Sequence, residues 1–174
     1  RLRWAPLCPL RWGEVARPGA GTGEVVSGDA VAARLQPLVA MDLALAERLR
    51  RGSAPVEVAL ETVGVPRLLR AVEASLGVRR LRLREGVVRA DVDVSGELVV
   101  AARWSQTQPE PLELEGLRAL AALLTLREGR VVVGERDLAV EANVMATVPD
   151  ALTRAVPLVE EVAPMLPTAS SRVA

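Results

Sequence analysis

The chain of 174 residues lacks several of the side chains on which enzymes most often rely. It contains no lysine, histidine, tyrosine, phenylalanine or isoleucine, and only one cysteine. Without histidine, lysine and tyrosine, the usual general bases, Schiff-base amines and phenolic donors are missing. The ligand sets of zinc sites are almost excluded as well. We therefore expect a protein that is not an enzyme and that holds neither a metal nor another cofactor.

The single cysteine and two loop-like motifs leave this expectation unchanged. Cys8 has no partner for an internal disulfide, and no base or metal ligand lies beside it in the sequence. The glycine-rich stretch 19–23 is similar to a phosphate loop but lacks the preceding strand and the lysine that such loops need. Asp91 and Asp93 match the opening of a calcium loop, yet Ala102 stands where that loop requires glutamate.

Charge and hydropathy narrow the function further. The 22 basic residues are all arginine and balance 22 acidic residues, which argues against a domain built mainly to hold nucleic acid. No apolar run approaches the roughly 18 residues needed to cross a bilayer, so we expect a cytoplasmic protein without a membrane partner. The missing phenylalanine, tyrosine, isoleucine and lysine use AT-rich codons, so the composition indicates a bacterial genome rich in GC.

Apolar and polar residues alternate through much of the chain, which predicts strands that are buried on one face only. A short turn at Glu85–Gly86 would place Leu83 opposite Val88. A three-residue turn at Ser95–Glu97 would place Val94 opposite Leu98 in the next hairpin. The last two predicted strands would form a hairpin. The predicted strands are 81–84, 87–94, 98–104, 130–133 and 138–144.

Helical periodicity fills the intervals between these strands. Pro66 and Gly77 stand at the expected first position and C-terminal cap of the first helix. The hydroxyl of Thr147 is expected to cap the third helix, and Pro157 is expected to kink it. The predicted helices are 66–77, 112–126 and 148–166.

These elements predict an α+β domain over residues 54–174. Its antiparallel sheet would have about five strands with helices packed on it, in the order helix, three strands, helix, two strands, helix. Residues 1–53 are predicted to form an N-terminal extension or small subdomain, with a helix over 29–51. A further short strand is predicted at 56–61.

The closing segment runs from Gly129–Val133 through Asp137–Ala142 into Asp150–Leu152. Its layout, together with the order of elements before it, resembles the YbjN-like and type III secretion chaperone superfamily. This resemblance implies a small, non-enzymatic, intracellular homodimer that binds segments of partner proteins on exposed apolar grooves. It therefore implies a chaperone-like or regulatory adaptor.

The arginines of the predicted sheet suggest a binding surface. In the predicted register, Arg82, Arg89 and Arg103 form a row on the outward face, while Asp91 and Asp93 share that solvated face. Asp91 would lie opposite Arg80. A row of guanidinium groups suits an acidic peptide or phosphates, so we predict that the three arginines of the row bind another protein or a peptide segment.

Two alternatives remain open. The same arginines would suit a nucleic-acid-linked accessory protein, whose binding would weaken as salt is raised. A carboxylate enzyme would need an acidic side chain in a dry pocket, and its candidates are Asp42 and the pair Asp91 and Asp93.

The second predicted helix carries an apolar stripe that is wider than one sheet face needs. We therefore predict that this helix or an edge strand of the sheet supplies the homodimer interface. The stripe consists of Leu114, Leu117, Leu120 and Leu124.

The predicted dimer can be tested directly. Light scattering at micromolar concentration should give twice the mass of one chain. A mass equal to that of one chain would count against the homodimer.

Overall fold

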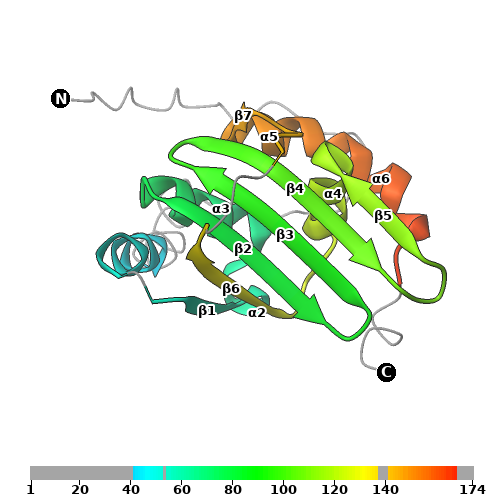
Figure 1. Cartoon of the computed structure of the whole chain (residues 1–174), viewed down its shortest axis with the longest axis horizontal. Coiled ribbons are helices and arrows are strands. Elements are labelled where there is room, and N and C mark those ends of the chain that lie inside the picture. The colour runs from blue at the N-terminus through cyan, green and yellow to red at the C-terminus, as the bar shows by residue number, and fades with distance from the viewer. Residues whose placement is uncertain (1–40, 53, 137–140, 168–174) are drawn as a thin grey trace, which may run out of the picture. The chain divides into compact units, whose positions relative to one another are not determined.

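The computed structural model describes residues 41–52, 54–136 and 141–167, which contain one seven-stranded sheet (Figure 1). The strands follow the order β1-β6-β2-β3-β4-β5, and β7 pairs with β4. Every pair of neighbouring strands is antiparallel. The strands are β1 Val56–Ala59, β2 Val78–Glu85, β3 Val88–Ser95, β4 Leu98–Gln106, β5 Leu112–Glu115, β6 Arg130–Glu135 and β7 Ala146–Thr147.

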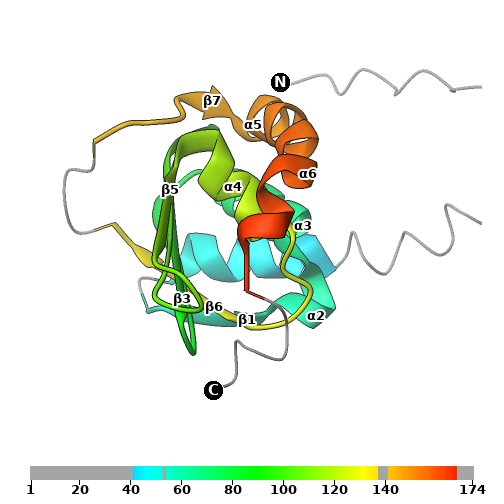
Figure 2. The same cartoon turned by 90° about the vertical axis from the view of Figure 1, so that its right-hand side faces the viewer.

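The helices cover one face of this sheet, as Figure 2 shows. Residues 41–51 are also helical, and the earlier part of the helix predicted over 29–51 lies outside the described residues. The predicted α+β class is confirmed, with more strands than the five that were expected. The helices are α2 Leu60–Val63, α3 Val65–Ala74, α4 Gly116–Leu124, α5 Val148–Ala155 and α6 Val159–Val162, with short 3-10 turns at η1 Val156–Leu158 and η2 Ala163–Met165.

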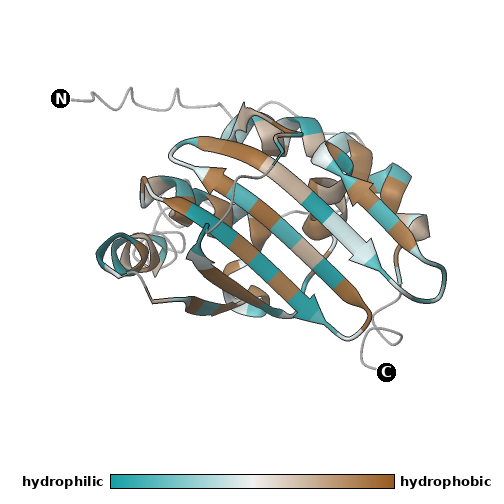
Figure 3. Ribbon diagram, in the orientation of Figure 1, coloured by the Kyte–Doolittle hydropathy of each residue, from teal (hydrophilic) through white to brown (hydrophobic). Residues whose placement is uncertain are grey.

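The hydrophobic core lies between the sheet and the helices. Apolar and polar residues alternate along β2 and β3, which gives the banded strands of Figure 3. Trp104, the largest buried side chain, is 1% exposed, and Leu69 and Leu120 from the helices are fully buried in the same cluster. Each fully buried leucine or valine contributes about 1.5–3 kcal/mol. Among the described residues, the core therefore consists mainly of leucine, valine and alanine, with Trp104 as its largest side chain.

The helix over residues 41–51 is joined to this core at its C-terminal end. Leu49 is 1% exposed and belongs to the core cluster. The buried guanidinium group of Arg79 on β2 donates hydrogen bonds to the carbonyls of Leu49 and Gly52. A cation at the C-terminal end of a helix also interacts favourably with the helix dipole. This helix therefore packs as part of the same unit as the sheet.

The hairpin between β2 and β3 differs from its predicted register by two residues. The turn is Gly86-Val87, so Leu83 lies opposite Ala90 and the predicted pair of Leu83 with Val88 is wrong. Gly86 occupies the first position of this turn with φ 52°, a conformation that glycine adopts readily and other residues rarely do.

The hairpin between β3 and β4 also has a shorter turn than predicted. Ser95 lies opposite Leu98 across a two-residue turn, so the predicted three-residue turn is wrong. The extra residue appears further along as a β-bulge: Val94 pairs with Val99, whereas the preceding residue, Asp93, pairs with Ala101. A bulge of this kind inserts one residue into one strand and restores the alternation of faces beyond it.

The predicted hairpin of 130–133 with 138–144 is wrong. β6 lies between β1 and β2 and pairs with both, so it has no free edge for a further strand. The next described strand, β7, instead pairs with β4, three strands away from β6 in the sheet. Residues 137–140 of the predicted hairpin lie outside the described residues.

Two helix boundaries differ from prediction as well. The helix expected over 112–126 begins at Gly116, because Leu112–Glu115 pair with β4 as β5. The first helix ends at Ala74 before its expected glycine cap, and Leu76 takes the left-handed conformation with φ 54°.

The closing helix behaves largely as predicted. The Thr147 hydroxyl accepts a hydrogen bond from the Asp150 N–H at 3.4 Å, which confirms the expected cap. Pro157 interrupts the helix, which continues as η1 and α6. This interruption is the consequence expected from a proline inside a helix.

Asp93 lies on the sheet face away from the helices, yet it is buried at 2% exposure. Arg80, opposite it on β2, donates two hydrogen bonds to its carboxylate at 2.8 and 3.3 Å. Arg136, which follows β6, brings its Nε to 3.8 Å from the Asp93 Oδ1. The prediction that Asp93 lies on a solvated face is therefore wrong, because residues distant in sequence cover it.

Removing this buried charge should cost much more than removing its exposed neighbour. Asp93→Asn should lower the free energy of unfolding by about 3 kcal/mol, because two largely buried guanidinium groups lose their counter-charge. Asp91→Asn is the matched control on the same strand and face, where the carboxylate side chain is 39% exposed and 3.9 Å from Arg82. Its cost should be below about 1 kcal/mol. Urea unfolding followed by circular dichroism measures both, and equal losses would contradict the assignment.

Candidate partner-binding surface

The sheet face away from the helices has a covered end and an open end. At the covered end, Arg136 lies against Asp93, and Asp93 and its cross-strand neighbour Ala101 are 2% and 1% exposed. At the open end, toward the Gly86 turn, no described helix lies over β2, β3, β4 and β5 (Figures 1 and 2). The open end is therefore the accessible part of this face.

One row of charged side chains crosses the open end and is neutralised within the chain. Residues opposite each other in a sheet project to the same face, so the row follows from the register. Arg82 Nε lies 3.9 Å from the Asp91 carboxylate, and Arg103 Nε lies 3.6 Å from that of Glu115. We call this the paired row, and it consists of Arg82, Asp91, Arg103 and Glu115.

The neighbouring row is not neutralised. Within the residues that the structure describes, neither arginine of this row forms an ion pair, and its glutamate forms none either. Two positive charges therefore stand at one end, a small hydroxyl in the middle and a negative charge at the other end. We call this the unpaired row, and it consists of Arg84, Arg89, Ser105 and Glu113, each opposite the next.

The two arginines of the unpaired row lie in the closer kind of cross-strand pair. The Thr107 N–H donates to the Val87 carbonyl at 3.2 Å. The backbone groups of successive strand residues point alternately toward the two neighbouring strands. Those of Val87 point toward β4, so those of Arg89, two residues further along, do as well. On the β2 side, Arg84 and Arg89 therefore form a non-hydrogen-bonded pair. Side chains are closest in such pairs, and like charges directly opposite each other destabilise a sheet. An anion placed between them would remove this repulsion.

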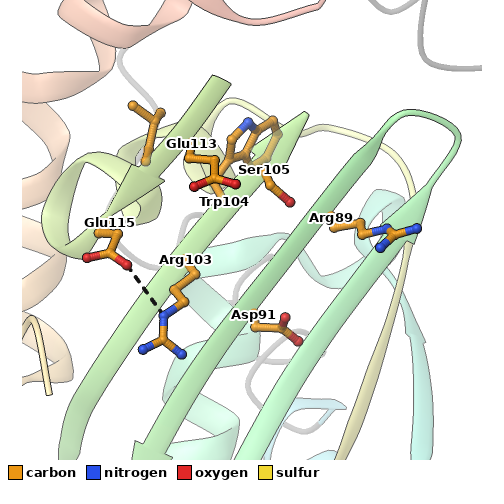
Figure 4. Close-up of a pocket in the computed structure, with 8 residues that line it drawn as sticks. Arg89, Asp91, Arg103, Trp104, Ser105, Glu113 and Glu115 are labelled. Carbon is orange, nitrogen blue, oxygen red and sulfur yellow. Dashed lines mark ion pairs between the residues drawn. The ribbon is translucent and has the colours of Figure 1, made fainter. Parts of the chain in front are cut away.

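A hollow of about 210 Å³ opens beside the unpaired row between β3, β4 and β5 (Figure 4). Ser105 is the smallest side chain of its rim and leaves space between Arg89 and Glu113. Small-molecule sites are typically larger, about 300–1,000 Å³, and mainly apolar. The hollow therefore suits one or two side chains of a partner. Its charged and polar lining is Arg89, Asp91, Arg103, Ser105, Glu113 and Glu115.

The structure separates the three arginines that were predicted to form a row. Arg82 and Arg103 both lie opposite Asp91, whereas Arg89 lies in the next row opposite Arg84. The predicted row is wrong because the β2–β3 and β3–β4 registers each differ from the prediction. Whether these arginines bind a partner stays a prediction. Sequence reasoning missed Arg84, although pairing of opposite charges across the hairpin would have favoured the observed register.

The leucines of the predicted dimer interface are largely engaged inside the chain. Leu120 is 0% exposed, and Leu114, which lies on β5 instead of the helix, is 7% exposed. Leu117 and Leu124 are half-buried. The dimer interface stays a prediction, with Leu117 and Leu124 as its accessible members.

The carboxylates that were candidates for catalysis lie in separate ion pairs. Asp42 accepts hydrogen bonds of 3.0 and 2.7 Å from Nε and Nη2 of Arg67, while Asp91 and Asp93 face different arginines. Among the described residues, no group of three or more histidine, cysteine, aspartate or glutamate side chains could hold a metal ion. In that same part of the chain, every helix is too short or too polar to cross a bilayer.

Comparisons with protein-family models, with curated proteins and with solved structures found no match. The class of the protein is therefore stated from its own features. It is an α+β protein whose sheet is covered by helices on one face and exposes a charged surface at the open end of the other.

The repulsion within the unpaired row predicts an unusual gain in stability. Arg84→Glu should raise the free energy of unfolding by about 0.5–1 kcal/mol, because the new carboxylate would lie directly opposite the Arg89 guanidinium group. The matched control is Arg82→Glu on the same strand and face, which should lower stability by a similar amount because it faces Asp91. Chemical denaturation at low salt measures both changes. A loss of stability in Arg84→Glu would contradict the register.

Proposed function

We propose that this protein is a non-enzymatic, protein-binding adaptor of chaperone-like or regulatory type, and that the open end of its sheet is the binding surface. One observation carries the proposal: Arg84 and Arg89 lie directly opposite each other without a counter-ion among the described residues. Proteins keep unfavourable surface arrangements where function requires them. An acidic side chain of a partner would supply the missing charge.

The dimensions of the surface support a protein partner over a small molecule. The hollow of about 210 Å³ is lined largely by charged side chains and bordered by three strands. Such a surface gives specificity through complementary charges. Its affinity would come from contacts along an extended partner segment, since exposed ion pairs contribute only about 0–1 kcal/mol each.

We further propose that the adaptor acts as a homodimer. The half-buried Leu117 and Leu124 on the α4 side retain some accessible apolar surface. An interface there would leave the open end of the sheet free for the partner, because the helices lie on the opposite face.

A nucleic-acid-linked accessory role is the second candidate. Arg82, Arg84 and Arg89 lie close together on adjacent strands and would attract phosphates. Asp91 and Glu113 stand beside them and would repel a phosphate backbone. This role requires binding that weakens steeply with salt and on Arg89→Ala, and indifference to salt would remove it.

Capture of partners from an extract of the source organism tests the proposal. The wild-type chain should retain a specific protein, and the double variant Arg84→Glu, Arg89→Glu should lose it, because both cationic contacts are reversed. Arg70→Glu, at an exposed arginine of α3, is the matched control and should retain the same protein. Failure of the wild-type chain to retain any protein above background would contradict the proposed function, as would equal retention by the double variant.

A further inference from the structure

We infer that the unpaired row recognises an extended segment of a partner protein that presents an acidic and a basic side chain on the same side. This inference rests on the proposed function and specifies the partner of that surface. The acidic side chain binds between Arg84 and Arg89, the basic side chain binds Glu113, and the part of the segment between them crosses the hollow at Ser105.

The separation of charge along the row is the first argument. Arg84 and Arg89 stand on β2 and β3, whereas Glu113 stands on β5 with Ser105 of β4 between them. Neighbouring strands are about 4.8 Å apart, so Arg89 and Glu113 are separated by about 10 Å along the row. The row is therefore positive at one end and negative at the other, and a ligand with both charges is complementary to it.

The paired row supplies the second argument by contrast. Its arginines already have carboxylate neighbours, Arg82 at Asp91 and Arg103 at Glu115. The same strands thus neutralise one row internally and leave the adjacent row without ion-pair partners among the residues that the structure describes. An isolated anion would satisfy Arg84 and Arg89 but would leave Glu113 unpaired. A ligand with a single charge therefore matches only half of the surface.

The size of the hollow supplies the third argument. Its volume of about 210 Å³ admits one or two side chains but is smaller than the usual small-molecule pocket. In an extended segment, side chains two and four positions apart face the same way and are about 6.7 and 13 Å apart. The acidic side chain binds between Arg84 and Arg89, half a strand spacing further from Glu113 than Arg89 is, so the two charges of the segment are about 12 Å apart. Four positions therefore match the row best, and flexible charged side chains cover the remainder.

Fluorescence anisotropy with labelled synthetic peptides tests this inference. The host is an extended peptide of alternating threonine and valine. In the first peptide, a glutamate and an arginine are four positions apart. In the second, the same two residues are three positions apart and so face opposite sides. The third carries two glutamates four positions apart. The full-length wild-type chain should bind the first peptide at least about fivefold more tightly than the other two, which corresponds to one or two exposed ion pairs.

Variants of the chain assign the two charges to their sites. Arg89→Ala and Glu113→Ala should each weaken binding of the first peptide about threefold to fivefold. Arg70→Ala on α3 should leave it unchanged, and circular dichroism confirms that all variants are folded. Inorganic phosphate at low millimolar concentration should displace the peptide only weakly, because it satisfies only the arginine end.

Three results would overturn the inference. They are equal binding of the three peptides, no binding of the first peptide at millimolar concentration, and binding that is unaffected by Glu113→Ala but abolished by phosphate. The last result would identify a simple anion site. The proposed function would survive any of them if the wild-type chain still retained a partner that the Arg84→Glu, Arg89→Glu variant lost. Failure of that capture would instead remove the proposed function itself.

Discussion

The register of the β2–β3 hairpin is the constraint on which the open surface depends. A shift of two residues would keep Leu81 and Leu83 on the core side, so hydrophobic burial alone does not distinguish the two arrangements. Charge and turn chemistry do distinguish them. The observed register places Arg80 opposite Asp93 and Arg82 opposite Asp91, and it gives Gly86 the turn position that has φ 52°. The same register brings Arg84 against Arg89 at the end of the hairpin. The fold thus gains two opposite-charge pairs and retains one repulsive pair at its accessible end.

The bulge between β3 and β4 completes the surface. Continued from the pair of Val94 with Val99, an unbroken register would turn Trp104 toward the open face and Arg103 and Ser105 toward the core. The extra residue, Val100, returns the tryptophan to the core and the two polar side chains to the open face. The bulge in β4 therefore buries Trp104 in the core and also places Arg103 and Ser105 in the lining of the hollow. The proposed binding role draws on this arrangement, in which the sheet holds charged side chains, without counter-ions in the described part of the chain, at defined spacings.

The sequence predicts the elements of this fold better than their pairing. Alternation identifies β2, β3 and β4, and the Thr147 cap identifies the start of α5, because these signals are local. Registers two residues apart bury the same side chains, so alternation could not select between them at Leu83. The partners of β6 and the burial of Asp93 depend on segments far away in the sequence, and no local pattern reports them. For the proposed site, the sequence predicted a binding role for Arg89 but not for Arg84 and Glu113, because their proposed roles follow from the neighbours that the register gives them.

The central claim is that Arg84 stands directly opposite Arg89, in a non-hydrogen-bonded pair. In such a pair the two Hα protons face each other across the strands. A nuclear Overhauser spectrum of the isotopically labelled chain tests the claim directly. The account predicts a strong cross-peak between the Hα protons of Arg84 and Arg89. A strong Hα cross-peak between Arg82 and Arg89 would establish the register shifted by two residues and contradict both the unpaired row and the function proposed for it.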